Sequence, residues 1–285
     1  MTPHSRRLLK TFAASIFVLV LAGVTYQGVA TALERRTFKY PGRLVPVGDH
    51  QLHVYCIGTG APTVVLEAPA LGFSESWSLV QTRLAMTTRV CAYDRAGLGW
   101  SEASDGPFDS RVIPEELHTL LAGAGERAPY LLVGDGLGAA LATLFASQFP
   151  GDTAGLVLLD SPRIAQFSTG GRVLRASPSP WLARTGVLRL SRLLSGNAPT
   201  LPGPPVGVVR AFSMRPDHLT RAAQEMRQLE AVITRARAAS LPADLPVRRF
   251  ESPDGTPLLA ASAQADEVTR LVADLVGDWR RGRSE

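Results

Sequence analysis

The stretch that decides the fold is YLLVGDGLGAALA, residues 130–142. It begins with an apolar run that suits a buried strand and ends with an Ala- and Leu-rich run that suits a helix. Between the two runs stand Gly134, Gly136 and Gly138. Because glycine lacks a Cβ atom, glycines at these alternate positions allow a turn too sharp for most other residues. The stretch therefore predicts a strand that turns abruptly into a helix.

Length and charge restrict the classes of protein that fit. The 285 residues are enough for one α/β domain of about 200–250 residues with an appendage. The net charge of +5 comes from arginine, since Lys10 and Lys39 are the only lysines. The arginines are scattered among Ala, Leu and Gly rather than gathered in a tract, which argues against nucleic-acid binding.

The N-terminal segment has the pattern of a membrane anchor. Residues 1–10 form a basic tail with Arg6, Arg7 and Lys10, and residues 11–31 form an uncharged run. At 1.5 Å per residue this run crosses a hydrocarbon core of about 30 Å. Positive charge before the run predicts a cytoplasmic N-terminus and an extracytoplasmic C-terminal domain, with residues 32–40 as a linker. The alternative is a signal peptide with an A-x-A cleavage site at residues 30–32, which would give a secreted protein.

Strand and helix patterns alternate through residues 41–285. Expected strands lie at residues 42–47, 52–56, 63–67, 89–94, 130–133 and 156–160. A hairpin is expected at Gly48-Asp49, between the first two strands. The alternation of strands with helices favours a mostly parallel sheet covered by helices on both faces.

Several motifs carry a resemblance to a known family. They are PGRLV (41–45), LHVYC (52–56), YDRAGLGWS (93–101), EELH (115–118), VGDGLG (133–138) and GLVLLD (155–160). Together they resemble the α/β-hydrolase fold family, and in particular exported bacterial members with an N-terminal membrane segment. The resemblance covers about residues 40–162. It implies a nucleophile elbow at residues 134–138, with the nucleophile at position 136.

The rest of the chain fits this fold with two departures. Residues 161–240 are rich in Arg, Ser, Pro and Gly, with a helix expected over 219–239, and the resemblance implies a helical cap there. The C-terminal strand region is shortened, because only about five turn residues, 252–256, separate the expected strands 246–251 and 257–261. A helix over residues 266–279 closes the domain.

The catalytic positions of the family are not retained. Gly136 offers no nucleophile, and Asp135, one position from the apex, is the alternative, dehalogenase-like candidate. Histidines occur at His4, His50, His53, His118 and His218. The family histidine follows the last strand, but no histidine follows His218 here. His4 precedes the apolar segment, and the resemblance implies a structural role for His118. We expect His50 and His53 to lie far from the carboxyl edge of the parallel strands, which leaves His218 in the cap as the single candidate base.

Four further residues belong to the candidate site. Asp160 and Ser161 follow the strand after the elbow, where some members of the family keep their acid. Backbone N–H groups of Ala70 and Leu137 are the candidate oxyanion donors, although Pro69 replaces a glycine expected in that loop and has no N–H to donate.

Cys56 and Cys91 are the two cysteines of the chain. The resemblance places them on neighbouring strands, and export would permit a disulfide between them. Zinc needs more ligands than this pair supplies, so neither a metal nor a cofactor is expected.

The leading functional hypothesis is a membrane-anchored pseudo-hydrolase that binds a small molecule, lipid or protein. A second hypothesis is an active, esterase-like hydrolase that uses Asp135, Asp160, Ser161 or His218. A third is attachment of an arginine-rich cap to membrane surfaces. Its candidate residues are Arg163, Arg172, Arg175 and Arg184.

Overall fold

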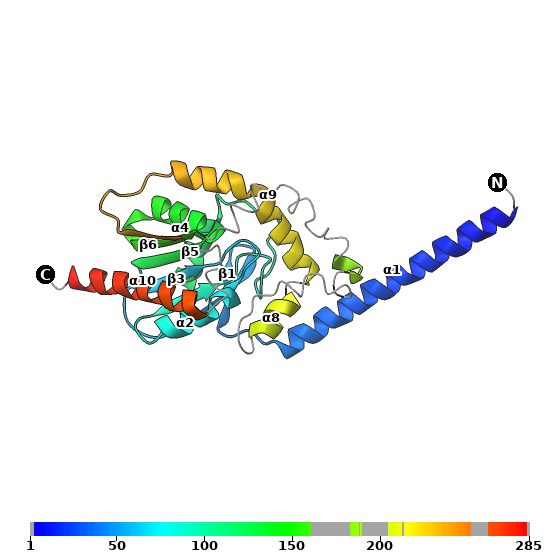
Figure 1. Cartoon of the computed structure of the whole chain (residues 1–285), viewed down its shortest axis with the longest axis horizontal. Coiled ribbons are helices and arrows are strands. Elements are labelled where there is room, and N and C mark those ends of the chain that lie inside the picture. The colour runs from blue at the N-terminus through cyan, green and yellow to red at the C-terminus, as the bar shows by residue number, and fades with distance from the viewer. Residues whose placement is uncertain are drawn as a thin grey trace.

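The computed structural model describes residues 3–160, 183–187, 189, 205–212, 214–251 and 262–283. A sheet flanked by helices forms the body of the molecule, and one long helix projects from it (Figure 1). The expected short strand at residues 257–261 and the turn before it lie outside the described residues.

Among the described residues the sheet has seven strands, in the order β1-β2-β4-β3-β5-β6-β7. Their bounds are β1 Arg43–Val47, β2 His50–Ile57, β3 Thr63–Glu67, β4 Val90–Tyr93, β5 Tyr130–Asp135, β6 Thr153–Asp160 and β7 Val247–Glu251. The expected hairpin joins β1 and β2, and Gly48 in its turn has φ 64°. β2 pairs antiparallel with both neighbours, and β4, β3, β5, β6 and β7 run parallel. The predicted mostly parallel sheet is confirmed.

Helices cover both faces of this sheet, as expected (Figure 1). On one face α3 (Ile113–Gly123) and α4 (Leu137–Gln148) pack into the apolar cluster that contains Leu132 and Leu156. On the other face α2 (Ser78–Leu84) and α10 (Ser262–Arg281) pack on Leu131 and Val157. Two short 3₁₀ helices, Ser74–Trp77 and Pro150–Asp152, complete the connections.

The described part of the segment between β6 and β7 lies over the carboxyl ends of the strands (Figure 1). Its described residues, 183–187, 189, 205–212 and 214–246, are called the insertion below. It contains α8 (Pro205–Phe212) and the long helix α9 (Pro216–Ala238), which corresponds to the helix expected over 219–239. Met226, Leu229 and Val232 of α9 pack against Leu137 and Leu141 of α4. The insertion therefore covers the turn where β5 becomes α4.

The N-terminal helix is longer than its apolar run. α1 spans Pro3–Thr37 and passes through most of the expected linker. Its stretch His4–Glu34 is long and apolar enough to cross a membrane, and none of its most apolar window is buried in the protein. Length and composition fit a single-pass anchor or a signal sequence.

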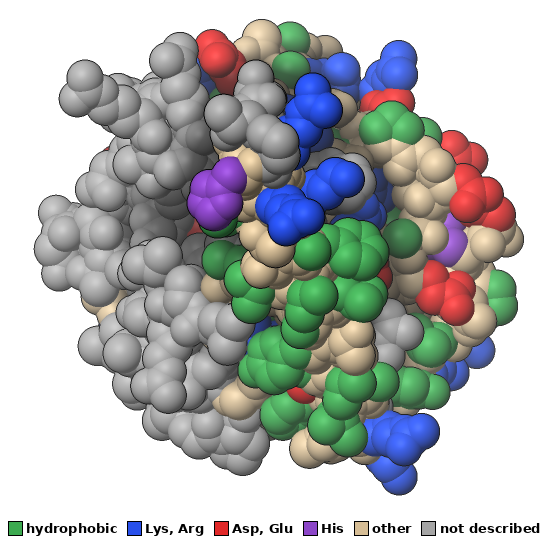
Figure 2. All heavy atoms as spheres, turned by 90° about the vertical axis from the view of Figure 1, so that its right-hand side faces the viewer, with side chains coloured by type: hydrophobic (Ala, Val, Ile, Leu, Met, Phe, Trp, Pro, Cys, Tyr) green, Lys and Arg blue, Asp and Glu red, His purple; other side chains and the backbone are tan. Residues whose placement is uncertain are grey.

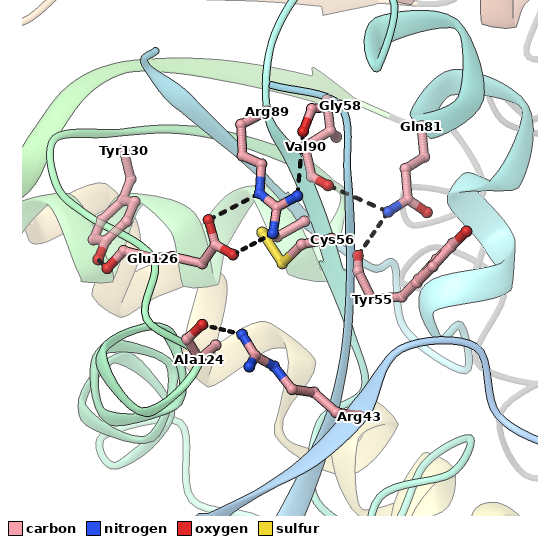
Figure 3. The surroundings of a disulfide bond; sticks show 11 residues. Arg43, Tyr55, Cys56, Gly58, Gln81, Arg89, Val90, Ala124, Glu126 and Tyr130 are labelled. Carbon is pink, nitrogen blue, oxygen red and sulfur yellow. Dashed lines mark hydrogen bonds and ion pairs between the residues drawn. A yellow bond between two sulfur atoms is a disulfide. The ribbon is translucent and has the colours of Figure 1, made fainter. Parts of the chain in front are cut away.

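Cys56 and Cys91 form the predicted disulfide. They face each other directly in the β2–β4 register, with Cα atoms 4.0 Å apart. Arg89, just before β4, donates to both carboxylate oxygens of Glu126 beside the bridge, at 3.1 and 2.7 Å (Figure 3). Glu126 brings a third potential metal ligand within 4.8 Å of the sulfurs. It is engaged by Arg89, however, and the sulfurs are bonded to each other.

Candidate functional site

The elbow has the sharp backbone turn that its glycines predict. β5 ends at Asp135 and α4 begins at Leu137, so Gly136 is the single residue between strand and helix. Its φ of 58° and ψ of −107° form a combination that residues with side chains rarely adopt. The Gly136 N–H donates to the Leu159 carbonyl of β6 at 2.9 Å, which ties the turn to the next strand. The strained turn is present, and the residue at its apex has no side chain.

The flanking glycines let α4 approach the sheet. A Cβ atom on Gly134 would lie 2.3 Å from the carbonyl oxygen of Gly138, and a Cβ atom on Gly138 would lie 2.2 Å from the carbonyl oxygen of Glu67. Both neighbours are backbone atoms, so neither can rotate away. The small residues on both sides of the apex are therefore required by packing.

The two candidate oxyanion donors belong to adjoining segments. Ala70 lies in a turn in which the Gly72 N–H donates to the Pro69 carbonyl at 3.0 Å. The Ala70 side chain packs against the apolar cluster that contains Leu137. Sequence reasoning thus named residues that the fold brings together, and their function as donors stays a prediction.

The structure describes some of the other candidate residues and leaves others outside the described residues. Asp135 is buried, with 3% of its surface exposed, at the end of β5. Asp160 ends β6 and pairs in register with Glu251 of β7. The Asp160 side chain and all of Ser161 lie outside the described residues, as do Arg163, Arg172 and Arg175. Arg184 is exposed.

His218 is held by backbone groups. It lies in the first turn of α9, is 4% exposed, and contacts the Phe73 ring edge to face at a centroid distance of 5.7 Å. Its Nδ1 accepts from the Gly99 N–H at 3.4 Å, which places the ring proton on Nε2. Nε2 then donates to the Leu71 carbonyl at 3.2 Å. Both nitrogens are occupied, so in this arrangement His218 does not accept a proton from a group above the elbow.

Because His218 is buried, its contribution to the stability of the fold depends on pH. Loss of water around the ring lowers its pKa, although Glu225 and Asp94 attract the imidazolium. A lowered folded-state pKa stabilises the fold above the unfolded-state pKa of about 6.5, and this stabilisation is lost as the pH falls. We expect acidification from about pH 7.5 to 5.5 to lower the thermal midpoint more in the wild type than in His218→Gln. An equal loss in both proteins would contradict this assignment.

A second buried histidine corrects one expectation. His53 was expected to lie far from the carboxyl edge of the parallel strands, and this is wrong. Because β2 runs antiparallel to β4, His53 lies beside Asp94, the residue directly after β4. His53 Nδ1 and Asp94 Oδ2 are 2.9 Å apart, and both side chains are fully buried.

The hydrogen bonds of the His53–Asp94 pair go to neighbouring loop backbone rather than toward a substrate. Asp94 also accepts from the backbone N–H groups of Ser74 at 2.7 Å and Trp100 at 2.9 Å. Burial opposes charge on both groups. Their mutual attraction nevertheless lowers the pKa of Asp94 and raises that of His53. The second ring nitrogen of His53 contacts the Pro41 carbonyl, so this imidazole is also fully used.

A buried charge cluster lies next to the elbow. Arg95 donates to Glu67 at 2.7 Å and, through two nitrogens, to both carboxylate oxygens of Glu225 at 2.7 and 3.0 Å. All three side chains are at most 1% exposed. The Tyr93 hydroxyl donates to the remaining oxygen of Glu67. Burial raises the pKa of Glu67, and Arg95 and Tyr93 offset part of that rise.

This cluster joins the insertion to the sheet. Arg95 also donates to the carbonyls of Ala68 and Pro69, at 2.8 and 3.0 Å, in the segment that continues into the candidate oxyanion loop. Because Glu225 belongs to α9, one guanidinium fixes the loop after β3 and the helix above it. The sequence did not predict this pair: Arg95 lies in the YDRAGLGWS motif, but nothing in the sequence around Glu225 marks it as the partner of Arg95.

Comparison with known proteins supports the architecture. No family model matches the chain. The chain is 26% identical over 183 residues to the uncharacterized protein C23C11.06c of Schizosaccharomyces pombe, which covers 53% of this chain and 34% of that protein. It is 32% identical over 90 residues to an AB hydrolase superfamily protein of Gibberella zeae, which covers 31% and 28%. The chain spans at most half the length of the curated relatives it matches.

Solved structures give the more extensive match. The Cif epoxide hydrolase of Acinetobacter nosocomialis aligns with a TM-score of 0.64 at 14% identity, over 89% of this chain and 96% of that one. The ancestral haloalkane dehalogenase AncHLD2 aligns with a TM-score of 0.63 at 18% identity, over 84% and 99%. The chain has an α/β-hydrolase fold. Likeness at this identity establishes the fold alone.

Within the α/β-hydrolase fold, the elbow and its flanking glycines stand at the usual junction of strand and helix. The groups that such a site needs for covalent catalysis are a nucleophile at the apex and a base that contacts it. Position 136 supplies no nucleophile, and the buried imidazoles of His53 and His218 are both bonded elsewhere.

Proposed function

We propose that the chain is a membrane-anchored, extracytoplasmic α/β-hydrolase-like protein that binds a ligand and has lost hydrolytic activity. The observation that carries the proposal is Gly136, which keeps the strained apex geometry without a side chain. Placement outside the cytoplasm is supported by the basic residues before the apolar helix and by the disulfide.

The arrangement of histidines supports loss of the base. A serine or aspartate mechanism needs an imidazole near the apex. His218, the last histidine in the sequence, contacts Gly99 and Leu71 instead. Loss of both the nucleophile and the base argues more strongly against hydrolysis than loss of either one, because the two groups act as a unit.

The binding role rests on the retained frame. α9 packs on α4 directly behind the apex, and Glu225 fixes it to Arg95. We infer that the insertion acts as a cap and that its ligand is a small molecule, a lipid or a protein segment held between cap and elbow. Ligands of this kind need shape and polar groups from the site, but no reacting side chain.

A relocated active site is the alternative. It is favoured by the burial of Asp135 one residue before the apex and by the likeness of the fold to epoxide hydrolases and a haloalkane dehalogenase. Epoxides, haloalkanes and short esters are therefore the first substrates to assay. An Asp135→Asn variant would lose any turnover if this alternative holds.

A rescue experiment separates the two possibilities. We expect Gly136→Ser and Gly136→Asp to remain inactive on esters, epoxides and haloalkanes, because restoring the nucleophile does not restore the base. Thermal unfolding of both variants would verify that they fold. Clear turnover by either variant would show that a base is present after all, and would favour the relocated site.

A further inference from the structure

The second half of α1 is also part of the folded domain. Gly23, Gln27, Thr31 and Glu34 recur at the spacing of one helical face. Three of them, Gly23, Gln27 and Glu34, contact the insertion, whereas Tyr26, Val29 and Leu33 on the other faces are 46%, 54% and 57% exposed. α8 and the short segment at residues 183–187 lie beside this part of α1 (Figure 1).

Polar contacts join the helix to the insertion. Gln27, 3% exposed, donates to the Met214 carbonyl at 3.0 Å and accepts from Arg189 Nε at 3.0 Å. Two turns further along, Arg189 pairs with the carboxylate of Glu34, and Arg215 lies 4.0 Å from the same group. These side chains satisfy one another only while α1 lies against the insertion.

Gly23 permits a direct contact between backbones. A Cβ atom at this position would lie 2.1 Å from the Thr185 carbonyl oxygen. Gly186 sits against the same turn of α1, since its own Cβ position would lie 2.9 Å from the Gly23 carbonyl oxygen and 3.3 Å from the Tyr26 ring. At Gly28, by contrast, an added Cβ would meet nothing within 4 Å.

These contacts limit how deep α1 enters a bilayer. Irregular backbone cannot face hydrocarbon, because its polar groups would lose their water. The segment around Thr185 therefore has to lie outside the hydrocarbon core. The uncharged helix between Lys10 and Gly23 is about 20 Å long, against about 30 Å of hydrocarbon. Lys10 and the nearby arginines must extend toward the opposite headgroups, as long basic side chains do.

We propose that the insertion docks on the uncleaved anchor, that the hydrocarbon span ends near Gly23, and that residues 183–187 lie in the headgroup layer of the bilayer. Tyr26, 46% exposed, then lies at the depth where the amphipathic rings of tyrosine and tryptophan gather. The exposed Arg184 meets lipid phosphates there. The end of the molecule that carries α1 shows basic side chains beside a hydrophobic band (Figure 2). The inference rests on the anchoring proposed above and is independent of catalysis.

Cysteine accessibility in the full chain tests the depth. Cys56 and Cys91 are bonded to each other, so an added cysteine is the single free thiol. Val18, Val24 and Val29 are all exposed on α1. With protein in membranes, a charged maleimide added outside is expected to label Val24→Cys and Val29→Cys and to leave Val18→Cys unlabelled. Protection of Val24→Cys and Val29→Cys would place the span at residues 11–31 and overturn the proposal, as would an intact mass lacking α1.

A glycine pair supplies the matched control. The Cβ atom of a leucine at position 23 collides with Thr185, whereas the Cβ atom of a leucine at position 28 meets nothing within 4 Å, and both substitutions raise the hydropathy of α1 equally. Gly23→Leu is expected to abolish labelling of Val24→Cys, because α1 no longer docks on the insertion and moves deeper into the bilayer. Gly28→Leu should preserve that labelling. Equal labelling in both backgrounds contradicts docking. Recovery of the chain in the soluble fraction would instead refute the anchor itself.

Discussion

Replacing Arg95 with methionine is expected to destabilise the protein by about 3–5 kcal/mol, because Glu67 and Glu225 would be left buried without their cation. Both carboxylates lie within 2.7 Å of guanidinium nitrogens and are at most 1% exposed. The loss should appear as a lower midpoint of thermal or denaturant unfolding. Since Arg95 also fixes α9, cleavage of the insertion by added protease should accelerate.

Two further variants test whether the lost stability comes from the buried charge cluster. Arg111→Met is the surface control, because the Arg111 side chain is 73% exposed in its pair with Asp109, and we expect its midpoint to stay near that of the wild type. Replacing Arg95, Glu67 and Glu225 together by methionine should recover much of the stability, since no unpaired charge then remains. Wild-type stability in Arg95→Met alone would contradict the assigned role of the cluster.

Removing the disulfide is the second large expected effect. The bridge closes a loop with a sequence separation of 35 residues. On the chain-entropy estimate, Cys56→Ala with Cys91→Ala should cost about 4 kcal/mol of unfolding free energy. Denaturant unfolding of the wild type and the double variant, each with and without reductant, measures the difference.

Reductant supplies the internal control for this prediction. It should lower the midpoint of the wild type toward that of the double variant and leave the double variant unchanged. Arg89 and Glu126 would remain paired beside the vacant positions, so the local ion pair is common to both proteins. An unaffected wild type under conditions that demonstrably reduce the bridge would show that the crosslink contributes nothing to stability.

Sequence patterns predicted the sheet and elbow well because their signals are local. Gly134 and Gly136 each meet a backbone requirement within the turn itself, and Gly138 stands at the fixed spacing that the elbow motif predicts, although the backbone it approaches belongs to Glu67. The match of Cys56 to Cys91 followed from the resemblance, which supplied the strand order. α9 and α10 were expected from apolar periodicity alone.

The missed features depend on distant partners or on register. Arg95 and Glu225 are 130 residues apart, and only the folded chain reveals that they meet. The error over His53 came from treating the first hairpin as remote, whereas the antiparallel register of β2 returns this residue to the carboxyl end of β4. The polar face of α1 at Gln27 and Glu34 was hidden within a segment read as anchor and linker.

The most direct test of the central claim is activity of the purified wild-type chain. Short p-nitrophenyl esters, epoxides and haloalkanes would be assayed together with labelling by a fluorophosphonate probe. We expect no turnover above buffer and no covalent labelling, because the apex at Gly136 has no nucleophile and both His53 and His218 are bonded elsewhere. Turnover that Asp135→Asn abolishes, or labelling of any residue above the elbow, would contradict the account.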